Sequence, residues 1–263
     1  RMQTRRMHFG EFFAPIYRHG PKLNASVRLA YDFAPANSRA RGRLLQSAAA
    51  YEQQGFELNL GGDHRGQPPS YFAPYGLPKL PDGPKGEYLT DREGTEAAKF
   101  IKEHASKPFF LNLAFHGVHT PLQAKPDLVA KYQRKLATTT GGQTNAVYAA
   151  MLESMDQAVG TVLRAIEDAG ISGKTALFFT SDNGGLVLGP NRPTSNAPLR
   201  SGKGSPYEGG VRVPLIVKAP GLTTVATQSK APVISMDLAA TILDIAGVAA
   251  TNATPDGRSL KPT

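Results

Sequence analysis

The stretch from Lys174 to Lys218 reads KTALFFTSDNGGLVLGPNRPTSNAPLRSGKGSPYEGGVRVPLIVK. Its first apolar segment, residues 175–180, is typical of a buried strand, and a second strand is expected from Val211 to Val217. The connection between them is long and rich in Gly and Pro, and such loops in compact domains usually carry function. The stretch therefore predicts a strand, a functional loop and a returning strand.

Polar residues stand at two points of this loop. Asp182 and Asn183 directly follow the first strand, and ligands of open α/β sheets lie at the carboxyl ends of strands. Lys203 lies between Gly202 and Gly204, so both its backbone and its ammonium group can approach an anion closely. The loop thus offers two oxygen ligands and one cation.

A second candidate cluster follows another apolar run. Residues 109–115 read FFLNLAF, which predicts a central strand buried on both faces. His116 and His119 come directly after it, before Pro121. Two histidines at the end of a core strand favour a function over simple packing.

A weaker candidate lies earlier in the chain. A short strand is expected within residues 55–62, which end in two glycines, and His64 and Arg65 follow in a proline-rich loop. These two side chains either point into a site or belong to a surface loop, and the sequence leaves both readings open.

Helical patterns alternate with these strands. The sequence Thr90-Asp-Arg-Glu93 matches a capping box and predicts a helix to about Ser106. The alternation predicts an α/β fold with a mostly parallel central sheet and helices on both faces. Further helices are expected over residues 125–132, 145–169 and 235–246.

Composition narrows the class of protein. The chain of 263 residues is long enough for one large α/β domain. It contains no cysteine, which excludes disulfides and thiolate metal sites. No apolar run approaches the roughly 18 residues of a membrane helix, and no apolar core of a signal peptide is visible. No membrane partner is therefore expected, and the compartment stays unknown from composition.

The positive charge is concentrated at the start of the chain. Residues 1–45 carry a net charge of +7, out of +9 for the whole sequence. A basic arm for nucleic acid would be one reading. No interleaving of aromatic and basic residues supports it, so we predict a poorly ordered segment over 1–50, outside the main sheet, and no nucleic-acid partner.

The candidate groups predict a common chemistry. Because carboxyl ends of parallel strands share one edge, the sequence can bring together His116, His119, Asp182, Asn183 and Lys203. Hard oxygen ligands favour Ca²⁺, or less so Mg²⁺, over zinc. A cation, a lysine and a histidine suit hydrolysis of a tetrahedral oxyanion ester.

Three motifs, taken in chain order, resemble those of the formylglycine-dependent sulfatase family. They are HGVHTP at 116–121, FFTSDNG at 178–184 and GKGSPYEGGVR at 202–212. The resemblance begins near residue 51 and implies an alkaline-phosphatase-like α/β sandwich, incomplete at both ends. It makes 51–263 a partial sulfatase catalytic domain.

The resemblance also implies roles for individual residues. Asp182 and Asn183 would be calcium ligands, and Lys203 and His119 would contact the sulfate and act in catalysis. His116 would bind substrate beside His119, and His64 would line the pocket. The implied substrate is a sulfated small molecule or carbohydrate, and the implied location is periplasmic or secreted. Nothing in the sequence predicts the oligomeric state.

Departures from the family pattern concern the nucleophile. The family makes its formylglycine from Cys or Ser in a C/S-x-P-x-R motif, of which residues 35–39, with Ser38, are only a loose echo. The family's N-terminal pair of aspartates is also missing. The chain alone is therefore expected to be a poor catalyst. Two alternatives are a non-catalytic anion-binding remnant and a phosphoesterase of the same superfamily.

Overall fold

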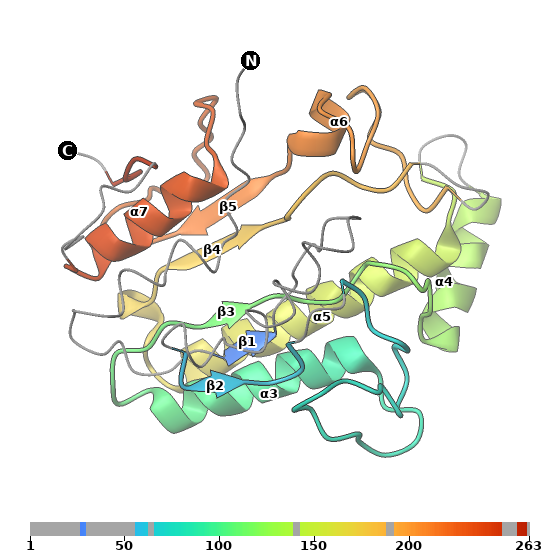
Figure 1. Ribbon diagram of the computed structural model, residues 1–263, viewed down its shortest axis with the longest axis horizontal. Helices are drawn as coiled ribbons and strands as arrows, with labels where there is room; N and C mark the ends of the chain where they lie inside the picture. The colour runs from blue at the N-terminus through green and yellow to red at the C-terminus, as the bar shows by residue number, and fades with distance from the viewer. Residues whose placement is uncertain are drawn as a thin grey trace, which may run out of the picture.

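The computed structural model describes residues 27–29, for their backbone, together with 56–62, 66–138, 143–187, 192–248 and 257–261. Strands and helices alternate along these segments (Figure 1). In chain order they are β1 (Val27–Leu29), β2 (Leu58–Asn59), α3 (Leu89–His104), β3 (Asn112–Leu113), α4 (Pro126–Ala137), α5 (Ala146–Asp168), the 3-10 turn η2 (Ser172–Lys174), β4 (Leu177–Thr180), α6 (Glu208–Val211), β5 (Leu215–Lys218) and α7 (Ser235–Ile245).

The strands form two small sheets. One is parallel in the order β2-β1-β3, with Arg28 opposite both Asn59 and Asn112. The other pairs β4 with β5 antiparallel, so that Phe179 lies opposite Ile216. The α/β prediction is confirmed, and the parallel arrangement holds for the first sheet, whereas the second sheet is antiparallel.

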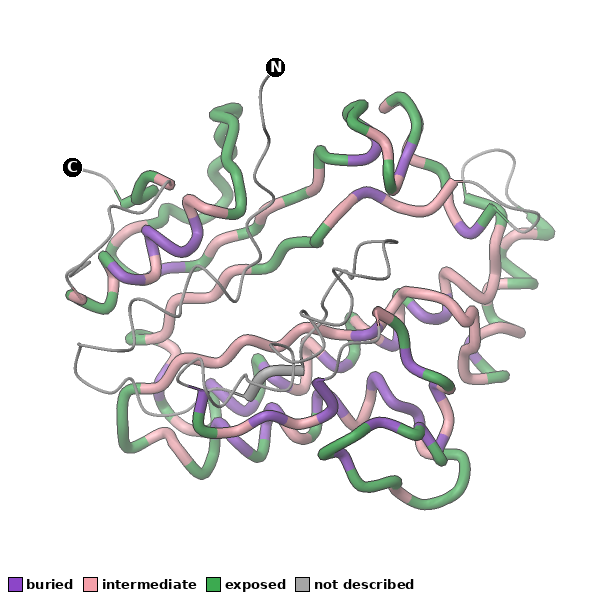
Figure 2. The backbone as a smooth tube through the Cα atoms, viewed as in Figure 1, coloured by how far each residue is buried: buried purple, intermediate pink, exposed green. Residues whose placement is uncertain are grey.

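Helices α3 and α5 pack against each other below the parallel sheet (Figure 1). They approach closely at Gly94, where an added Cβ would lie 2.9 Å from the Cβ of Ala158. Buried apolar side chains of both helices, among them Ile101 and Ile166, belong to one core cluster. Figure 2 shows buried positions along both helices. The helix predicted over residues 145–169 is thus α5, capped by Asn145, whose side chain accepts from the backbone of Tyr148.

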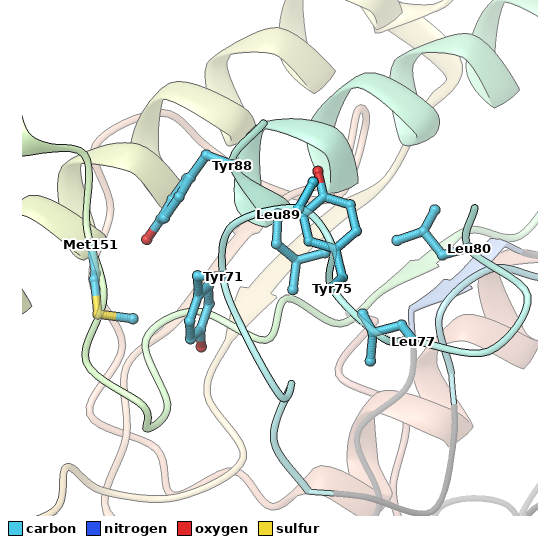
Figure 3. Packing of buried hydrophobic residues seen from close by; sticks show 8 residues of the cluster. Tyr71, Tyr75, Leu77, Leu80, Tyr88, Leu89 and Met151 are labelled. Carbon is cyan, nitrogen blue, oxygen red and sulfur yellow. The ribbon is translucent and has the colours of Figure 1, made fainter. Parts of the chain in front are cut away.

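A second core lies near the start of α3. Tyr71, Tyr88 and Met151 belong to this cluster, and Figure 3 shows their side chains together with Tyr75 and Leu89. The rings of Tyr71 and Tyr88 stack with centroids 5.9 Å apart. These rings immobilise the irregular loop that precedes α3.

The two apolar strands are less buried than their composition predicts. Residues 109–115 are all only half-buried, and β3 spans just Asn112–Leu113. In β4, the side chain of Phe179 is 38% exposed. Among the described strands, β3 and β4 each stand at an edge of their own sheet, with no strand paired between them.

Two boundaries differ from the sequence prediction. The strand expected from Val211 begins only at Leu215, because residues 208–211 close a helical turn, α6. The expected capping box is also wrong, because α3 begins at Leu89 and Thr90 already lies inside the helix. The carboxylate of Glu93 turns inward instead and contacts His116.

The expectation for the N-terminal segment needs one correction. Residues 27–29 supply β1, the middle strand of the parallel sheet, so this part of 1–50 does not lie outside the sheet. Three residues are too few for a periodic signal in the sequence. The rest of 1–50 lies outside the described residues. None of the described helices combines the length and the apolar character that a membrane crossing requires.

Candidate functional site

A tight turn after β3 presents His119. The backbone N–H of His119 donates to the carbonyl of His116 over 3.0 Å. The hydroxyl of Tyr71 contacts both carbonyl oxygens of this turn, that of His116 and, at 3.0 Å, that of His119. Nδ1 of the His119 ring lies 3.0 Å from the carbonyl of Thr120. Because a carbonyl only accepts, Nδ1 carries a proton, and in the neutral ring Nε2 carries the lone pair.

Asp182 and Asn183 follow the carboxyl end of β4, as predicted. The side chain of Thr180, the last residue of β4, donates to the carbonyl of Pro214 over 3.0 Å and ties this end to the start of β5. Ser181 then closes a small turn by donating to the carbonyl of Asn183. The amide of Asn183 donates to Oδ2 of Asp182. The two side chains therefore lie side by side at the strand end.

The loop of Lys203 packs tightly against the segment that follows Asp182. The backbone N–H of Lys203 donates to the carbonyl of Gly185, and that of Gly184 donates to the carbonyl of Gly210, both over 3.0 Å. A Cβ on Gly202 would lie 2.4 Å from the carbonyl oxygen of Gly185, so only glycine fits there. The glycines thus let the lysine loop lie directly on the segment that carries Asp182.

His119, Lys203 and Asp182 act on one another electrostatically. Burial lowers the pKa of His119, its hydrogen bond to Thr120 opposes that shift, the charge of Lys203 lowers the pKa further, and Asp182 raises it. Burial also lowers the pKa of Lys203, against the pull of Asp182. His119 and Lys203, which are distant in sequence, are thus both half-buried, and the exposed carboxylate of Asp182 influences both.

Two further predicted residues are His116 and His64. The side chain of His116 is 1% exposed, and its Nδ1 contacts Oε1 of Glu93 at 2.6 Å. Its role as a substrate ligand stays a prediction. His64 lies outside the described residues.

Two residues that shape the turn were missed from the sequence. Glu93 was assigned to a helix cap, and Tyr71 lies in a proline-rich loop with no distinguishing pattern. Only their three-dimensional contacts identify them.

Asp182 and Asn183 are the candidate ligands of a calcium site. Asp182 and Asn183 supply oxygen donors of the hard type that Ca²⁺ prefers. Ca²⁺ takes about six to eight oxygens, and the described part of the chain holds no group of three or more acidic, His or Cys side chains able to bind a metal. These two residues therefore fit part of a calcium site and do not complete one.

Comparison with known proteins identifies the family. The family model for Sulfatase matches residues 42–248, which is most of the chain. The chain belongs to the sulfatase family, and its fold is the alkaline-phosphatase-like α/β fold of that family.

Individual relatives agree with this assignment. A sulfatase of Formosa agariphila is 42% identical over 61% of this chain, and the rat steryl-sulfatase is 34% identical over 73%. These alignments cover 30% and 32% of the two relatives, so the chain spans about a third of their length. The crystal structure of Ps i-CgsB in complex with k-i-k-neocarrahexaose matches 96% of this chain and 64% of its own, with a TM-score of 0.66 and 26% identity.

Proposed function

We propose that this chain carries the sulfate-recognition part of a sulfatase active site and serves the hydrolysis of sulfuric esters. The observation that carries the proposal is the convergence of His119, Lys203 and Asp182 from two distant segments. Membership of the sulfatase family supports the same reaction class.

The two basic groups have distinct roles in this proposal. The ammonium group of Lys203 offsets the negative charge of the sulfate and the charge that develops on the leaving oxygen. His119 keeps the proton on Nδ1 against Thr120, so its Nε2 is the atom that takes up or returns a proton. Their partial burial strengthens both interactions relative to water.

A sulfated carbohydrate is the substrate class that we propose. Ps i-CgsB was solved with the carbohydrate k-i-k-neocarrahexaose, and an N-acetylgalactosamine-6-sulfatase from dog is 36% identical over 59% of this chain. Steryl-sulfatases are also similar, so a steryl sulfate is the competing substrate for the assay. By the same family resemblance we propose a periplasmic or secreted location.

The described residues supply neither a formylglycine nucleophile nor a complete metal site. The sequence has no cysteine to supply a formylglycine, and Ser38 lies outside the described part of the chain. We propose that Asp182 and Asn183 contribute to a Ca²⁺ site, and derive no chemical step through either group. The missing cysteine also supports a second candidate function, which is sulfate binding without turnover.

The decisive experiment measures binding and turnover separately. Inorganic sulfate is titrated calorimetrically into the chain and its Lys203→Ala variant, and an aryl sulfate is assayed in the presence of calcium. We expect sulfate binding to weaken about 10- to 100-fold in Lys203→Ala, because hydrogen bonds to charged groups contribute about 1.5–3 kcal/mol. Lys218→Ala, an exposed lysine at the end of β5, is the matched control.

Turnover distinguishes the two candidate functions. Robust hydrolysis that disappears in Lys203→Ala would reveal a nucleophile, and Ser38→Ala would be the first variant to test it. Sulfate binding without turnover would favour the second candidate. Equal binding by Lys203→Ala and Lys218→Ala would contradict the proposed site.

A further inference from the structure

Helix α3 places a carboxylate in the interior of the protein beside the histidine turn. The side chain of Glu93 is fully buried, and Oε1 accepts hydrogen bonds from Nδ1 of His116 at 2.6 Å and from its backbone N–H at 3.3 Å. Burying a carboxylate is costly unless hydrogen bonds compensate. Both of these donors belong to one residue, at the start of the turn that carries His119.

The pairing is not optimised for stability. Oε2 of Glu93 is buried without a hydrogen-bond partner among the described residues. A half-satisfied buried carboxylate stabilises a fold poorly, because each unsatisfied group costs about 1–3 kcal/mol or more. Such exceptions call for an explanation, and function is one of the recognised ones.

His116 links Glu93 to the site through the backbone. The carbonyl of His116 accepts from the N–H of His119. The hydroxyl of Tyr71 contacts the carbonyl oxygens of both residues. Because Glu93 accepts only, Nδ1 of His116 is the protonated nitrogen, and the ring is fixed in both tautomer and orientation. A carboxylate behind a histidine orients ligand-binding histidines in the same way elsewhere.

We propose that Glu93 is a positioning residue, which holds His116 and so places His119 beside Lys203 in the geometry that binds a sulfate oxyanion. This inference rests on the proposed function. Glu93 touches no substrate in this arrangement and acts through its neighbour. The electrostatic influence of His116 on His119 is consistent with their close placement.

The test compares two glutamates of the same helix. Glu93→Gln keeps the shape and one acceptor oxygen but removes the charge, and Glu96→Gln makes the same change one turn away, where Glu96 pairs with Arg92. We expect Glu93→Gln to weaken binding of inorganic sulfate about 10-fold, as second-shell substitutions do. Glu96→Gln should leave the affinity within about twofold, because its partner Arg92 belongs to α3 itself and not to the histidine turn.

A double variant separates positioning from a general loss of stability. His116→Gln removes the same contact from the other side, so it should weaken sulfate binding like Glu93→Gln, and the double variant should be no weaker than either. Affinities are measured below the thermal transition of every variant. Additive losses, or a Glu93→Gln affinity equal to that of Glu96→Gln, would overturn the proposal.

The imidazole resonances of His119 provide a readout that needs no ligand. We expect Glu93→Gln and His116→Gln, but not Glu96→Gln, to shift them in ¹H–¹⁵N spectra. If the unaltered chain failed to bind sulfate while these shifts appeared, the proposed function would fall and the positioning would stand. Unmoved resonances would overturn the positioning in either case.

Discussion

The two halves of the candidate site come from regions of very different packing. Between α3 and α5 the facing apolar side chains are buried, and Ile101 is 0% exposed, whereas Leu152 and Leu163 elsewhere on α5 are exposed. The β4–β5 sheet instead leaves apolar side chains in solvent, with Phe179 38% and Ile216 62% exposed (Figure 2). His119 is anchored to the first region, and Asp182 and Lys203 belong to the second.

This contrast indicates that the site depends unequally on its two sides. Around His119, buried groups of three elements hold a single turn, through Tyr71, Glu93 and His116. Around Lys203, glycine-mediated backbone contacts such as that to Gly185 hold an otherwise half-exposed loop. Changes in the first region should therefore alter both stability and binding, whereas changes in the second should act mainly on binding.

The largest expected effect compares the same substitution in the two regions. Ile101→Ala should lower the free energy of unfolding by about 2–5 kcal/mol, because it leaves a cavity between α3 and α5. Ile216→Ala on β5 should change it by no more than about 0.5 kcal/mol, since its side chain is largely in solvent. Urea denaturation followed by circular dichroism measures both values. Similar losses in the two variants would show that the β4–β5 surface is covered in solution.

A smaller effect is expected from one hydroxyl group. Tyr71→Phe removes the hydrogen bonds to the carbonyls of His116 and His119 and should cost about 1–3 kcal/mol of stability. Tyr88→Phe is a matched control, because its hydroxyl donates to the carbonyl of Gln123. Both variants should lose stability, but only Tyr71→Phe should also weaken sulfate binding in calorimetry. Equal sulfate affinities in the two variants would show that the turn of His116 and His119 does not contribute to sulfate binding.

The helices were predictable because their signals are local. The long apolar stripe and the cap at Asn145 fixed α5 to within a residue at each end. The strands were harder, since an apolar run reports what a segment can bury and not which neighbours it has. Residues 109–115 are therefore only half-buried despite their composition. Strand β1 has three residues and joins the sheet through non-local pairing that no local pattern reveals.

The site was predictable only in part, for a related reason. Asp182, Lys203 and His119 stand at strand ends and in a glycine-rich loop, and topology alone brings such positions together. The partners that hold them in place are set by contacts between elements distant in sequence. Glu93 and His116 are 23 positions apart, and the pattern around Glu93 favoured a helix cap instead. The sequence thus indicates candidate groups for the site and misses contacts, such as that of Glu93, that hold them in place.

The pH dependence of binding tests the shared environment of His119. Because burial and Lys203 lower its pKa, the ring is neutral at neutral pH, and a bound sulfate raises that pKa again. Affinity should be highest below the pKa of the free ring, fall as the pH rises by at most about tenfold per unit, and level off above the pKa in the complex. Sulfate titrations from below the pKa of the free ring to above the pKa in the complex measure this change in affinity. His119→Gln should make the sulfate affinity nearly independent of pH in this range. This result would assign the pH dependence to His119 and not to Lys203, Asp182 or His116.

The smallest expected effect concerns calcium. Asp182 and Asn183 are two donors where Ca²⁺ takes about six to eight oxygens, so the ion should bind this chain weakly, with a dissociation constant of about millimolar or above. Asp182→Ala should lower that weak affinity further, whereas Asp156→Ala, an exposed aspartate on α5, should not change it. Calorimetric titration with calcium chloride, followed by removal with a chelator, compares the three proteins. Tight binding that is lost in Asp182→Ala would mean that residues outside the described part of the chain complete the calcium site. The β4–β5 region would then hold its half of the site more firmly than the contrast in packing predicts.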